Sequence, residues 1–368
     1  MSDHFTPLAR SLPASIPFVG PEALERRLGR PFQARLGANE SVFGPSPLAI
    51  EAMRESAGRS WMYGDPEHFE LREALAAHLG TPVPTIAVGE GIDGLLGHLV
   101  RLACAPGDLV VTSLGAYPTF NYHVAGHGGR LDFVPYRDDR EDIDALIERA
   151  RAVRPKLLYF ANPDNPTGSV HDARAVERLI ESVPGETILV LDEAYGDMAP
   201  AALPAIGLVR PNLLRFRTFS KAYGLAGARV GFAVGHPDLV AGFDRVRNHF
   251  GLSRVSQAGA LAALKDPGHL DAVLGRIAAA RERIAAIAEK AGLRPLPSAT
   301  NFVAIDCGGD GARARAILEG VIARGVFIRM PGVAPLDRMI RVTAGMPGDL
   351  DLFEAALHGA LREVGAAT

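Results

Sequence analysis

The sequence predicts an α/β fold: a large domain whose mostly parallel sheet is sandwiched by helices, joined to a small α+β domain. Three observations support this prediction. Between about residues 85 and 235, short apolar strands alternate with helical segments, as in a parallel sheet covered on both faces. Beyond about Leu239 the pattern changes to long Ala-rich helices and then to mixed strands and helices. A chain of 368 residues is also too long for one small core.

The N-terminal part is predicted to be an arm that leads into the large domain. Residues 1–40 are assigned to the arm and part of the small domain, residues 41–250 to the large domain, and residues 251–368 to an interdomain helix and the C-terminal small domain. The periodicity predicts helices at Pro21–Leu28, Pro47–Ala57 and Phe69–Leu79.

The alternating region is predicted to contain seven strands with helices between them. Branched and aromatic residues predict strands at Thr85–Val88, Leu109–Thr112, Arg130–Pro135, Leu157–Ala161, Thr187–Leu191, Leu213–Thr218 and Arg229–Val234. Helices are expected from about Leu95 to Ala103, after Tyr117, and at Ile143–Val153 and Ala173–Val183.

The C-terminal third is predicted to be a compact α+β unit reached through a long helix. Its expected helices are Ser256–Leu264, Leu270–Ala291, Ala312–Arg324 and Leu350–Val364, and its expected strands are Phe302–Asp306, Val326–Arg329 and Met339–Thr343.

Composition excludes several classes of protein. Apolar residues make up 48% of the chain and charged residues 22%, which is typical of a globular protein. A net charge of −3 without a basic run gives no electrostatic case for nucleic acid. Cys104 and Cys307 match no metal or redox spacing and are predicted to be buried thiols. With no secretory signal and no apolar run of membrane-spanning length, we expect a cytoplasmic protein with no membrane partner.

A lysine in a Gly-rich stretch is the first candidate for chemistry. The stretch from Thr218 to Gly231 reads T-F-S-K-A-Y-G-L-A-G-A-R-V-G and contains Lys221, one of only four lysines among 39 basic residues. Lysine can lose its proton and attack a carbonyl carbon, whereas arginine stays charged. The setting favours a Schiff-base lysine beside a phosphate site. An ordinary solvated lysine is the alternative.

A second Gly-rich segment, G-E-G-I-D-G from Gly89 to Gly94, lies between a predicted strand and a predicted helix. It matches the spacing of dinucleotide-binding loops, but that fingerprint also needs an acid at the end of the second strand. Here Asp108 precedes that strand and Ser113 follows it. We therefore predict a phosphate cradle at a helix N-terminus, without a dinucleotide; a purely structural turn is the alternative.

Polar motifs follow two neighbouring strands. N-P-D-N-P-T-G, from Asn162 to Gly168, follows the strand Leu157–Ala161, and D-E-A-Y, from Asp192 to Tyr195, ends the next strand. Loops at the carboxyl ends of parallel strands are where such folds bind ligands. Asp192 follows an apolar strand, so its carboxylate needs a cation or donors, and a protonated ring nitrogen would supply one. An Asx-Pro turn and a helix N-cap remain the structural alternatives.

Two arginines lie in apolar strands near the C-terminus, Arg329 in V-F-I-R-M-P and Arg341 in M-I-R-V-T-A-G. Arginine in such a strand often binds a planar anion, although an edge-strand arginine is also common. A metal is not expected, because His123 and His127 have i,i+4 spacing but no third ligand. No G-x-S-x-G stretch supports a serine hydrolase.

With these motifs in order, the chain resembles the class I/II aminotransferases, pyridoxal-phosphate enzymes of fold type I. L-G-A-N-E-S, N-P-D-N-P-T-G, D-E-A-Y, S-K-A-Y-G-L-A-G-A-R-V-G and I-R-V-T-A-G together resemble the histidinol-phosphate branch most closely. The resemblance implies pyridoxal 5'-phosphate as cofactor and transfer of an amino group between an amino compound and a 2-oxo acid. Histidinol phosphate is the favoured substrate. An aromatic or other amino-acid aminotransferase, a decarboxylase or lyase on the same scaffold, and a binding protein with an inactive site are the alternatives.

The resemblance also implies a role for each candidate residue. Lys221 would bind the cofactor covalently and act as general base and acid, and Asp192 would pair with the pyridine nitrogen. The remaining cofactor contacts would be Tyr195 and Asn165 at the ring oxygen, Phe120 on the ring face, and Gly91, Ile92, Thr218, Ser220 and Arg229 at the phosphate.

Substrate binding and assembly follow from the same resemblance. Arg341, helped by Arg329, would bind the anionic group of the substrate, with Asn165 nearby. Tyr63 matches a tyrosine that reaches the phosphate in the neighbouring subunit, which implies a homodimer. Two departures from the histidinol-phosphate branch are Phe18, after Pro17, and Phe120, since that branch usually has tyrosine at both places. The first removes one donor to a substrate phosphate.

Overall fold

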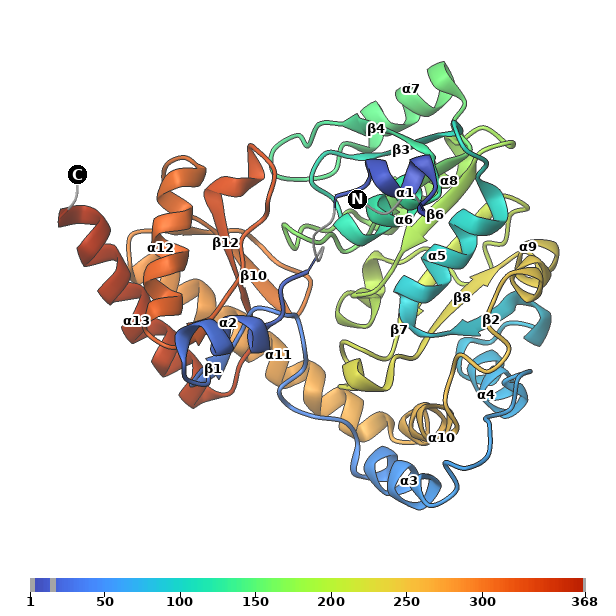
Figure 1. Ribbon diagram of the computed structural model, residues 1–368, viewed down its shortest axis with the longest axis horizontal. Coiled ribbons are helices and arrows are strands. Elements are labelled where there is room, and N and C mark those ends of the chain that lie inside the picture. Colours follow the sequence, from blue (N-terminus) through green and yellow to red (C-terminus); the bar gives the residue numbers. More distant parts are fainter. Residues whose placement is uncertain (1–3, 14–17, 367–368) are drawn as a thin grey trace.

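The computed structural model describes residues 4–13 and 18–366 and has a seven-stranded sheet at the centre of its larger part (Figure 1). The strand order is β2-β8-β7-β6-β5-β3-β4; β8 runs antiparallel to both of its neighbours, β2 and β7, and the other adjacent pairs are parallel. The predicted mostly parallel sheet is therefore confirmed. Its strands are β2 (Ile86–Gly89), β3 (Leu109–Ser113), β4 (Arg130–Val134), β5 (Leu157–Ala161), β6 (Ile188–Asp192), β7 (Leu213–Thr218) and β8 (Gly231–Gly235).

Helices cover both faces of this sheet, as the apolar strands require. In β5, Tyr159 packs on the side of α5 and α6, while Leu158 and Phe160 pack on the side of α7 and α8. At the β2 edge, α3 packs against α10, and α4 and α9 lie beside β2. These helices are α3 (Pro47–Ala57), α4 (Phe69–Leu79), α5 (Gly91–Ala103), α6 (Pro118–Gly126), α7 (Ile143–Val153), α8 (Ala173–Ser182), α9 (Pro237–Gly242) and α10 (Arg254–Ala263).

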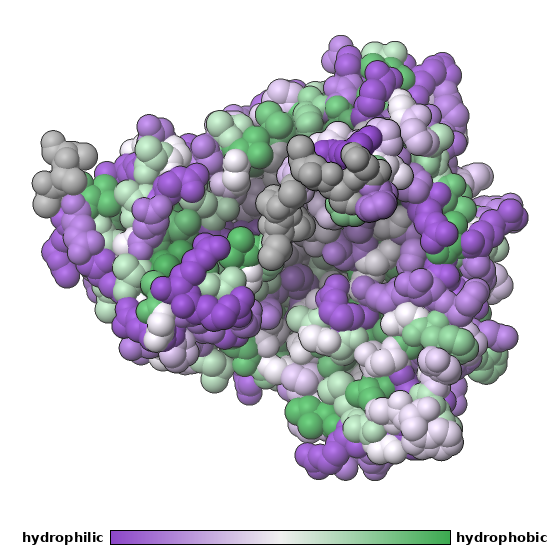
Figure 2. Space-filling model, in the orientation of Figure 1, coloured by the Kyte–Doolittle hydropathy of each residue, from purple (hydrophilic) through white to green (hydrophobic). Residues whose placement is uncertain are grey.

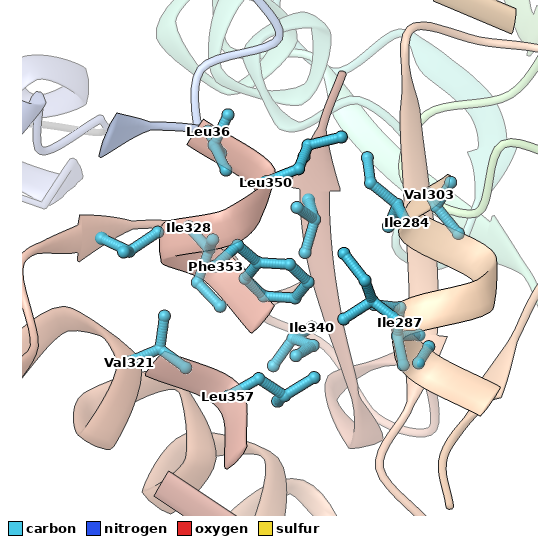
Figure 3. Close-up of a cluster of buried hydrophobic side chains, with 14 of the residues drawn as sticks. Leu36, Ile284, Ile287, Val303, Val321, Ile328, Ile340, Leu350, Phe353 and Leu357 are labelled. Atoms are coloured by element: carbon cyan, nitrogen blue, oxygen red, sulfur yellow. The ribbon is translucent and has the colours of Figure 1, made fainter. Parts of the chain in front are cut away.

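A small α+β unit lies beside the large sheet, and the long helix α11 runs between the two (Figure 1). Its core surrounds the fully buried Phe353, with Ile284, Leu36 and Ile340 nearby (Figure 3). One sheet has the antiparallel order β12-β10-β9, and β1 pairs with β11 in parallel. The elements are α2 (Pro21–Leu28), β1 (Ala34–Arg35), α11 (Pro267–Lys290), β9 (Arg294–Pro295), β10 (Phe302–Asp306), α12 (Gly311–Ala323), β11 (Val326–Phe327), β12 (Met339–Thr343) and α13 (Pro347–Ala366). The short helix α1 (Pro7–Ser11) lies instead against the large part, near α6 (Figure 1).

The helix starts follow from capping residues in the sequence. The Ser46 hydroxyl accepts a hydrogen bond from the Leu48 backbone N–H at 3.1 Å, and Pro47 occupies the first helical position of α3. The prediction for α5 was wrong at its start, because the helix begins at Gly91 and not near Leu95. Glycine weakens the helical pattern of the first turn, which hides the start from the sequence.

Two further predictions have clear outcomes. Cys104 and Cys307 are buried free thiols, as expected. The strand expected over Val326–Arg329 is shorter, because regular pairing ends at Phe327. Arg329 instead forms an isolated antiparallel bridge with Arg341, so the two arginines are neighbours although only Arg341 lies in a regular strand.

Candidate active site

The carboxyl ends of β5, β6 and β7 bring three of the predicted site residues to one edge of the sheet. Asn165 follows β5, Asp192 ends β6 and Lys221 follows β7. Because these parallel strands are adjacent, their loops start side by side. The surface is hollowed between the large sheet and the small unit (Figure 2). The candidate site is therefore a product of strand order.

Lys221 is mostly buried at this edge. Its ammonium donates a hydrogen bond to the Asn39 carbonyl oxygen at 3.0 Å and lies 5.6 Å from the centre of the Tyr195 ring. Burial, together with the positive charges of Arg341 and Arg229, lowers the pKa of Lys221 to about 8. A lysine with such a pKa is partly neutral near physiological pH, and the neutral amine can attack a carbonyl carbon or take a proton.

Asp192 is buried, and each of its carboxylate oxygens accepts one hydrogen bond. The Tyr159 hydroxyl donates to Oδ2 at 2.7 Å, and the Ala194 backbone N–H donates to Oδ1 at 2.9 Å. Burial raises the pKa of Asp192, while these two hydrogen bonds oppose that rise. Among the described residues no cation forms a salt bridge with this carboxylate, and each oxygen keeps a free lone pair. A protonated ring nitrogen therefore fits this acid.

An anion-binding corner forms at the N-terminus of α5. Gly91 has a positive φ of 76°, and a Cβ there would lie 2.5 Å from Nη2 of Arg229. Nη1 of Arg229 lies 3.4 Å from the Ser220 hydroxyl, which accepts a hydrogen bond from the Thr218 hydroxyl at 2.9 Å. Gly231 packs against the same turn, since its Cβ would lie 2.6 Å from the backbone nitrogen of Ile92. A 13-residue helix terminus, an arginine and a hydroxyl together suit a phosphate group.

Two aromatic side chains, Phe120 and Tyr195, also belong to this site. Phe120 on α6 is fully buried and stacks on Tyr159, with ring centroids 4.7 Å apart and 20° between the planes. Tyr195 is also buried, and its hydroxyl oxygen accepts a hydrogen bond from the Asn39 side-chain amide at 2.8 Å. Burial raises the pKa of Tyr195, so its hydroxyl stays protonated and can donate.

Arg341 and Arg329 reach the site from the small unit. Their backbones pair through two N–H···O bonds of 3.2 and 2.6 Å. Nη1 of Arg341 donates to the side-chain oxygen of Asn165, which connects β12 to the loop after β5. The Nε atoms of both arginines are buried, with no hydrogen-bond partner among the described residues. Burial and the charge of Arg341 lower the pKa of Arg329 to about 10. Two neighbouring, partly buried guanidiniums favour binding of an anion.

Phe18 lies against Arg329, with its ring centroid 3.8 Å from the guanidinium carbon. The next residue, Val19, accepts a hydrogen bond from Arg329 through its carbonyl oxygen. Pro17, the other half of the predicted pair, is outside the described residues. The N-terminal arm therefore contributes Phe18 next to an arginine predicted to bind substrate.

Tyr63 is the one predicted site residue that the structure leaves outside this group. Its side chain is 73% exposed and stacks on Phe250, with ring centroids 4.4 Å apart. The Arg254 guanidinium donates to the Tyr63 carbonyl oxygen at 2.8 Å and holds the loop in place. Within one chain, Tyr63 is thus a surface residue.

Two residues of the site had no role assigned from the sequence, Tyr159 and Asn39. Besides donating to Tyr195, Asn39 accepts a hydrogen bond from the Thr343 hydroxyl at 3.2 Å, and its carbonyl oxygen accepts from both Lys221 and Asn301. Asn39 therefore connects the small unit to the lysine and the tyrosine of the large sheet. Its position after Gly37 in L-G-A-N-E-S is the sequence signal that could have identified it, because asparagine tolerates the left-handed conformation that the structure shows there, with a φ of 55°.

Other kinds of site are not supported by the described part of the chain. Within residues 4–13 and 18–366, no group of three His, Cys, Asp or Glu side chains could hold a metal ion. His123, considered above as a ligand, lies 3.4 Å from Asp93. A cavity of about 600 Å³ lies between α4, β2 and α9, and none of the predicted site residues lines it. No helix in the same residues is long and apolar enough to span a membrane.

The fold places a lysine and an acid at neighbouring strand ends, close to an anion-binding corner. Comparison with known proteins identifies the class of enzyme that has this arrangement. The model of the family "Aminotransferase class I and II" matches residues 33–353, and the chain belongs to that family. The predictions of an aminotransferase and of its fold are thereby confirmed.

The chain is also similar to individual members of this family. The chain is similar to the histidinol-phosphate aminotransferase of Sinorhizobium meliloti, whose crystal structure is in complex with pyridoxal-5'-phosphate; identity is 54% over 99% of both chains, with a TM-score of 0.96. The histidinol-phosphate aminotransferase of Moorella thermoacetica is 33% identical over 92% of this chain and 88% of that protein. The aromatic amino acid aminotransferase of Nocardia farcinica is 35% identical over 96% of each chain.

Proposed function

We propose that this aminotransferase uses pyridoxal 5'-phosphate to transfer the amino group of histidinol phosphate to 2-oxoglutarate, giving imidazole acetol phosphate and glutamate. The relatives named histidinol-phosphate aminotransferase support this substrate. The structural observation that carries the proposal is the pair of partly buried guanidiniums, Arg329 and Arg341, whose buried Nε atoms lack partners and which lie next to the loop of Asn165. The substrates are anionic, so two arginines with free Nε donors are suited to bind them.

The candidate residues have complementary roles in this proposal. When bound, pyridoxal phosphate supplies an electron sink and a carrier for the amino group. Lys221 would take the proton from the α-carbon of the amino donor in the first half-reaction, and in the second half-reaction it would deliver a proton to the corresponding carbon of the 2-oxo acceptor. Asp192 holds the proton on the ring nitrogen. Tyr195 and Asn165 would donate to the ring oxygen, Phe120 would cover a ring face, and the residues that would bind the phosphate are Gly91, Ile92, Thr218, Ser220 and Arg229.

A panel of amino donors tests this proposal. We expect the purified protein to bind pyridoxal phosphate, and glutamate and histidinol phosphate each to convert its absorption to that of the amine form of the cofactor. Phenylalanine and tyrosine test the second candidate, which the similarity to the Nocardia farcinica aromatic enzyme supports. A spectrum that glutamate and histidinol phosphate leave unchanged would rule out the proposed reaction. Carbon dioxide release with any donor would instead support decarboxylation.

Phe18 provides a specific prediction for the phosphate substrate. Phe18→Tyr adds a hydroxyl to a ring that already lies against Arg329. If the substrate phosphate binds beside Arg329, the hydroxyl should add one hydrogen bond and improve affinity by about 1 kcal/mol. The measurement is KM for histidinol phosphate, with KM for glutamate as the internal control. Equal changes for both substrates, or weaker binding of histidinol phosphate, would contradict the prediction.

We further propose a homodimer in which Tyr63 contributes to the site of the partner subunit. Tyr63 belongs to a group of exposed aromatic residues whose burial by a second copy would be favourable: Trp61 is 81% exposed, Phe69 57% and Phe250 48%. Sedimentation should give the mass of two chains. Mixing inactive Lys221→Ala with a Tyr63→Ala variant should restore activity through hybrid dimers that contain one intact site. A monomer in sedimentation would contradict this proposal.

The domain limits and the compartment remain proposals of the same kind. We propose an N-terminal arm and part of the small domain at residues 1–40, a large domain at 41–250, and an interdomain helix with the C-terminal small domain at 251–368. Limited proteolysis should cut near these limits and spare the sheet strands. We also propose that the enzyme works in the cytoplasm, which fractionation of cells that produce it would test.

A further inference from the structure

Tyr159 in β5 lies beside the acid at the end of β6. In the parallel register Tyr159 pairs with Val190, so Asp192 is two residues further along the same face of the sheet. A long aromatic side chain can reach across that distance, and the Tyr159 hydroxyl donates a 2.7 Å hydrogen bond to Oδ2 of Asp192. Tyr159 is fully buried, so no solvent competes for its hydroxyl.

The ring of Tyr159 has a second contact in the same site. It stacks on Phe120, the residue proposed to cover the cofactor ring, at 4.7 Å between centroids. One side chain therefore contacts both the acid and the aromatic residue that would bind the same ring. Because Phe120 is itself fully buried, the stack fixes the direction of the Tyr159 hydroxyl.

The hydroxyl can serve only as a donor to Asp192. Burial and the negative charge of Asp192 raise the pKa of Tyr159 well above its ordinary value, so the hydroxyl keeps its proton. An ionised carboxylate accepts hydrogen bonds and does not donate them, so this contact favours the ionised form of Asp192. Burial acts in the opposite direction on the same carboxyl group.

Other titratable groups also act on this pair. The positive charge of Lys221 favours the ionised form of Asp192, and the negative charge of Glu193 disfavours it. The remaining groups that interact with the pair are Tyr117 at the start of α6, Glu141 before α7 and Tyr195 after β6. Tyr159 differs from these groups because it contacts the carboxylate directly through a hydrogen bond.

We propose that Tyr159 is a positioning residue that keeps Asp192 ionised and oriented toward the nitrogen of the cofactor ring. The inference rests on the proposed use of pyridoxal phosphate and extends it to a residue that does not touch the cofactor nitrogen. With Tyr159 on one oxygen and the Ala194 backbone N–H on the other, rotation of the carboxylate would break a hydrogen bond in a buried site. The ring nitrogen then meets an acceptor already held in place.

Tyr159→Phe tests the proposal because it retains the ring and its stack on Phe120 and removes only the hydroxyl. We expect the dissociation constant of pyridoxal phosphate, measured by titration of the cofactor-free dimer, to rise about tenfold. The pH at which the absorption of the bound cofactor changes should also shift. Tyr159→His, which retains a ring N–H donor, should recover part of both values. Tyr136→Phe is the matched control, since the Tyr136 hydroxyl donates to the different acid Asp164 at 2.9 Å.

A double-mutant cycle separates positioning from general loss of packing. In an Asp192→Asn background, Tyr159→Phe should change the dissociation constant less than about twofold, because the hydroxyl acts through the carboxylate. An equal loss in both backgrounds, or no loss in the native background, would overturn the inference. If the unaltered protein does not bind pyridoxal phosphate, the proposed function fails instead. The two failures are therefore distinguishable.

Discussion

Lys221→Ala should lower the rate of amino-group transfer by at least about 10⁴-fold. The variant loses both the amine that bonds to the cofactor and the base that moves the α-proton. No other lysine can replace it, because Lys156, Lys265 and Lys290 lie elsewhere in the chain. Single-turnover kinetics at saturating cofactor measure the loss, and absorption spectra should lack the band of covalently bound cofactor.

Lys290→Ala is the matched control for this experiment. Lys290 is an exposed residue near the end of α11, paired with Glu354 at 2.6 Å. Its removal should leave the rate within about twofold, since an exposed ion pair contributes little. If Lys221→Ala retains more than about 1% of the rate, a different residue moves the proton and the assignment of Lys221 is wrong.

Replacing Lys221 should lower the rate but raise the stability of the cofactor-free protein. The pKa of Lys221 falls from 10.5 to about 8 on folding, so the folded state binds fewer protons between these two pH values. The free energy of unfolding therefore rises as pH increases from 8 to 10.5, and below pH 8 the buried ammonium lowers it by about 3 kcal/mol. Lys221→Met should remove this penalty and this pH dependence. Urea unfolding at pH 7 and pH 10 measures both effects.

Much of the fold is predictable because its signals are local. Pro47 at the first helical position, Ser46 before it and an apolar stripe indicate where α3 begins. The apolar runs of β5 and β7 are bounded by polar loops, so their limits also agree with the sequence. Asp192 and Lys221 were also identified from local signals: Asp192 ends an apolar strand, and Lys221 is one of only four lysines and lies in a Gly-rich stretch.

Contacts made across the fold were not predictable in this way. Tyr159 lies within L-L-Y-F-A, where an aromatic residue looks like ordinary core, and its acceptor is 33 residues away. Glu193 is fully buried and accepts hydrogen bonds from Arg215 at 2.7 Å and Arg217 at 2.9 Å, but L-L-R-F-R-T does not show which acid pairs with them. Such partners depend on strand order and register, and the sequence determines these only through the assembled sheet.

Asp192→Asn should reduce the rate of transfer by about 10³-fold, or about 4 kcal/mol in transition-state free energy. A neutral amide cannot hold the proton on the ring nitrogen, so the ring accepts electrons from the α-carbon less well. Breaking a buried charge pair on one side typically costs about 3–5 kcal/mol, which agrees with this magnitude. The measurements are kcat, which should fall, and the dissociation constant of pyridoxal phosphate, which should rise.

The cofactor-free Asp192→Asn variant separates this loss from damage to the fold. Burial raises the pKa of Asp192, so the free energy of unfolding falls as pH rises through that pKa, and an asparagine has no such dependence. The variant should therefore be at least as stable as the native protein at neutral pH, since Asn still accepts from the Ala194 N–H. Glu141→Gln controls for an amide in a buried acid position, because Glu141 bonds to Ser113 and the Ala161 backbone N–H and not to the proposed ring. We expect the Asp192→Asn variant to lose activity but stay folded, and the Glu141→Gln variant to keep its activity and its stability. If Asp192→Asn is unfolded or fully active, the role assigned to Asp192 is wrong.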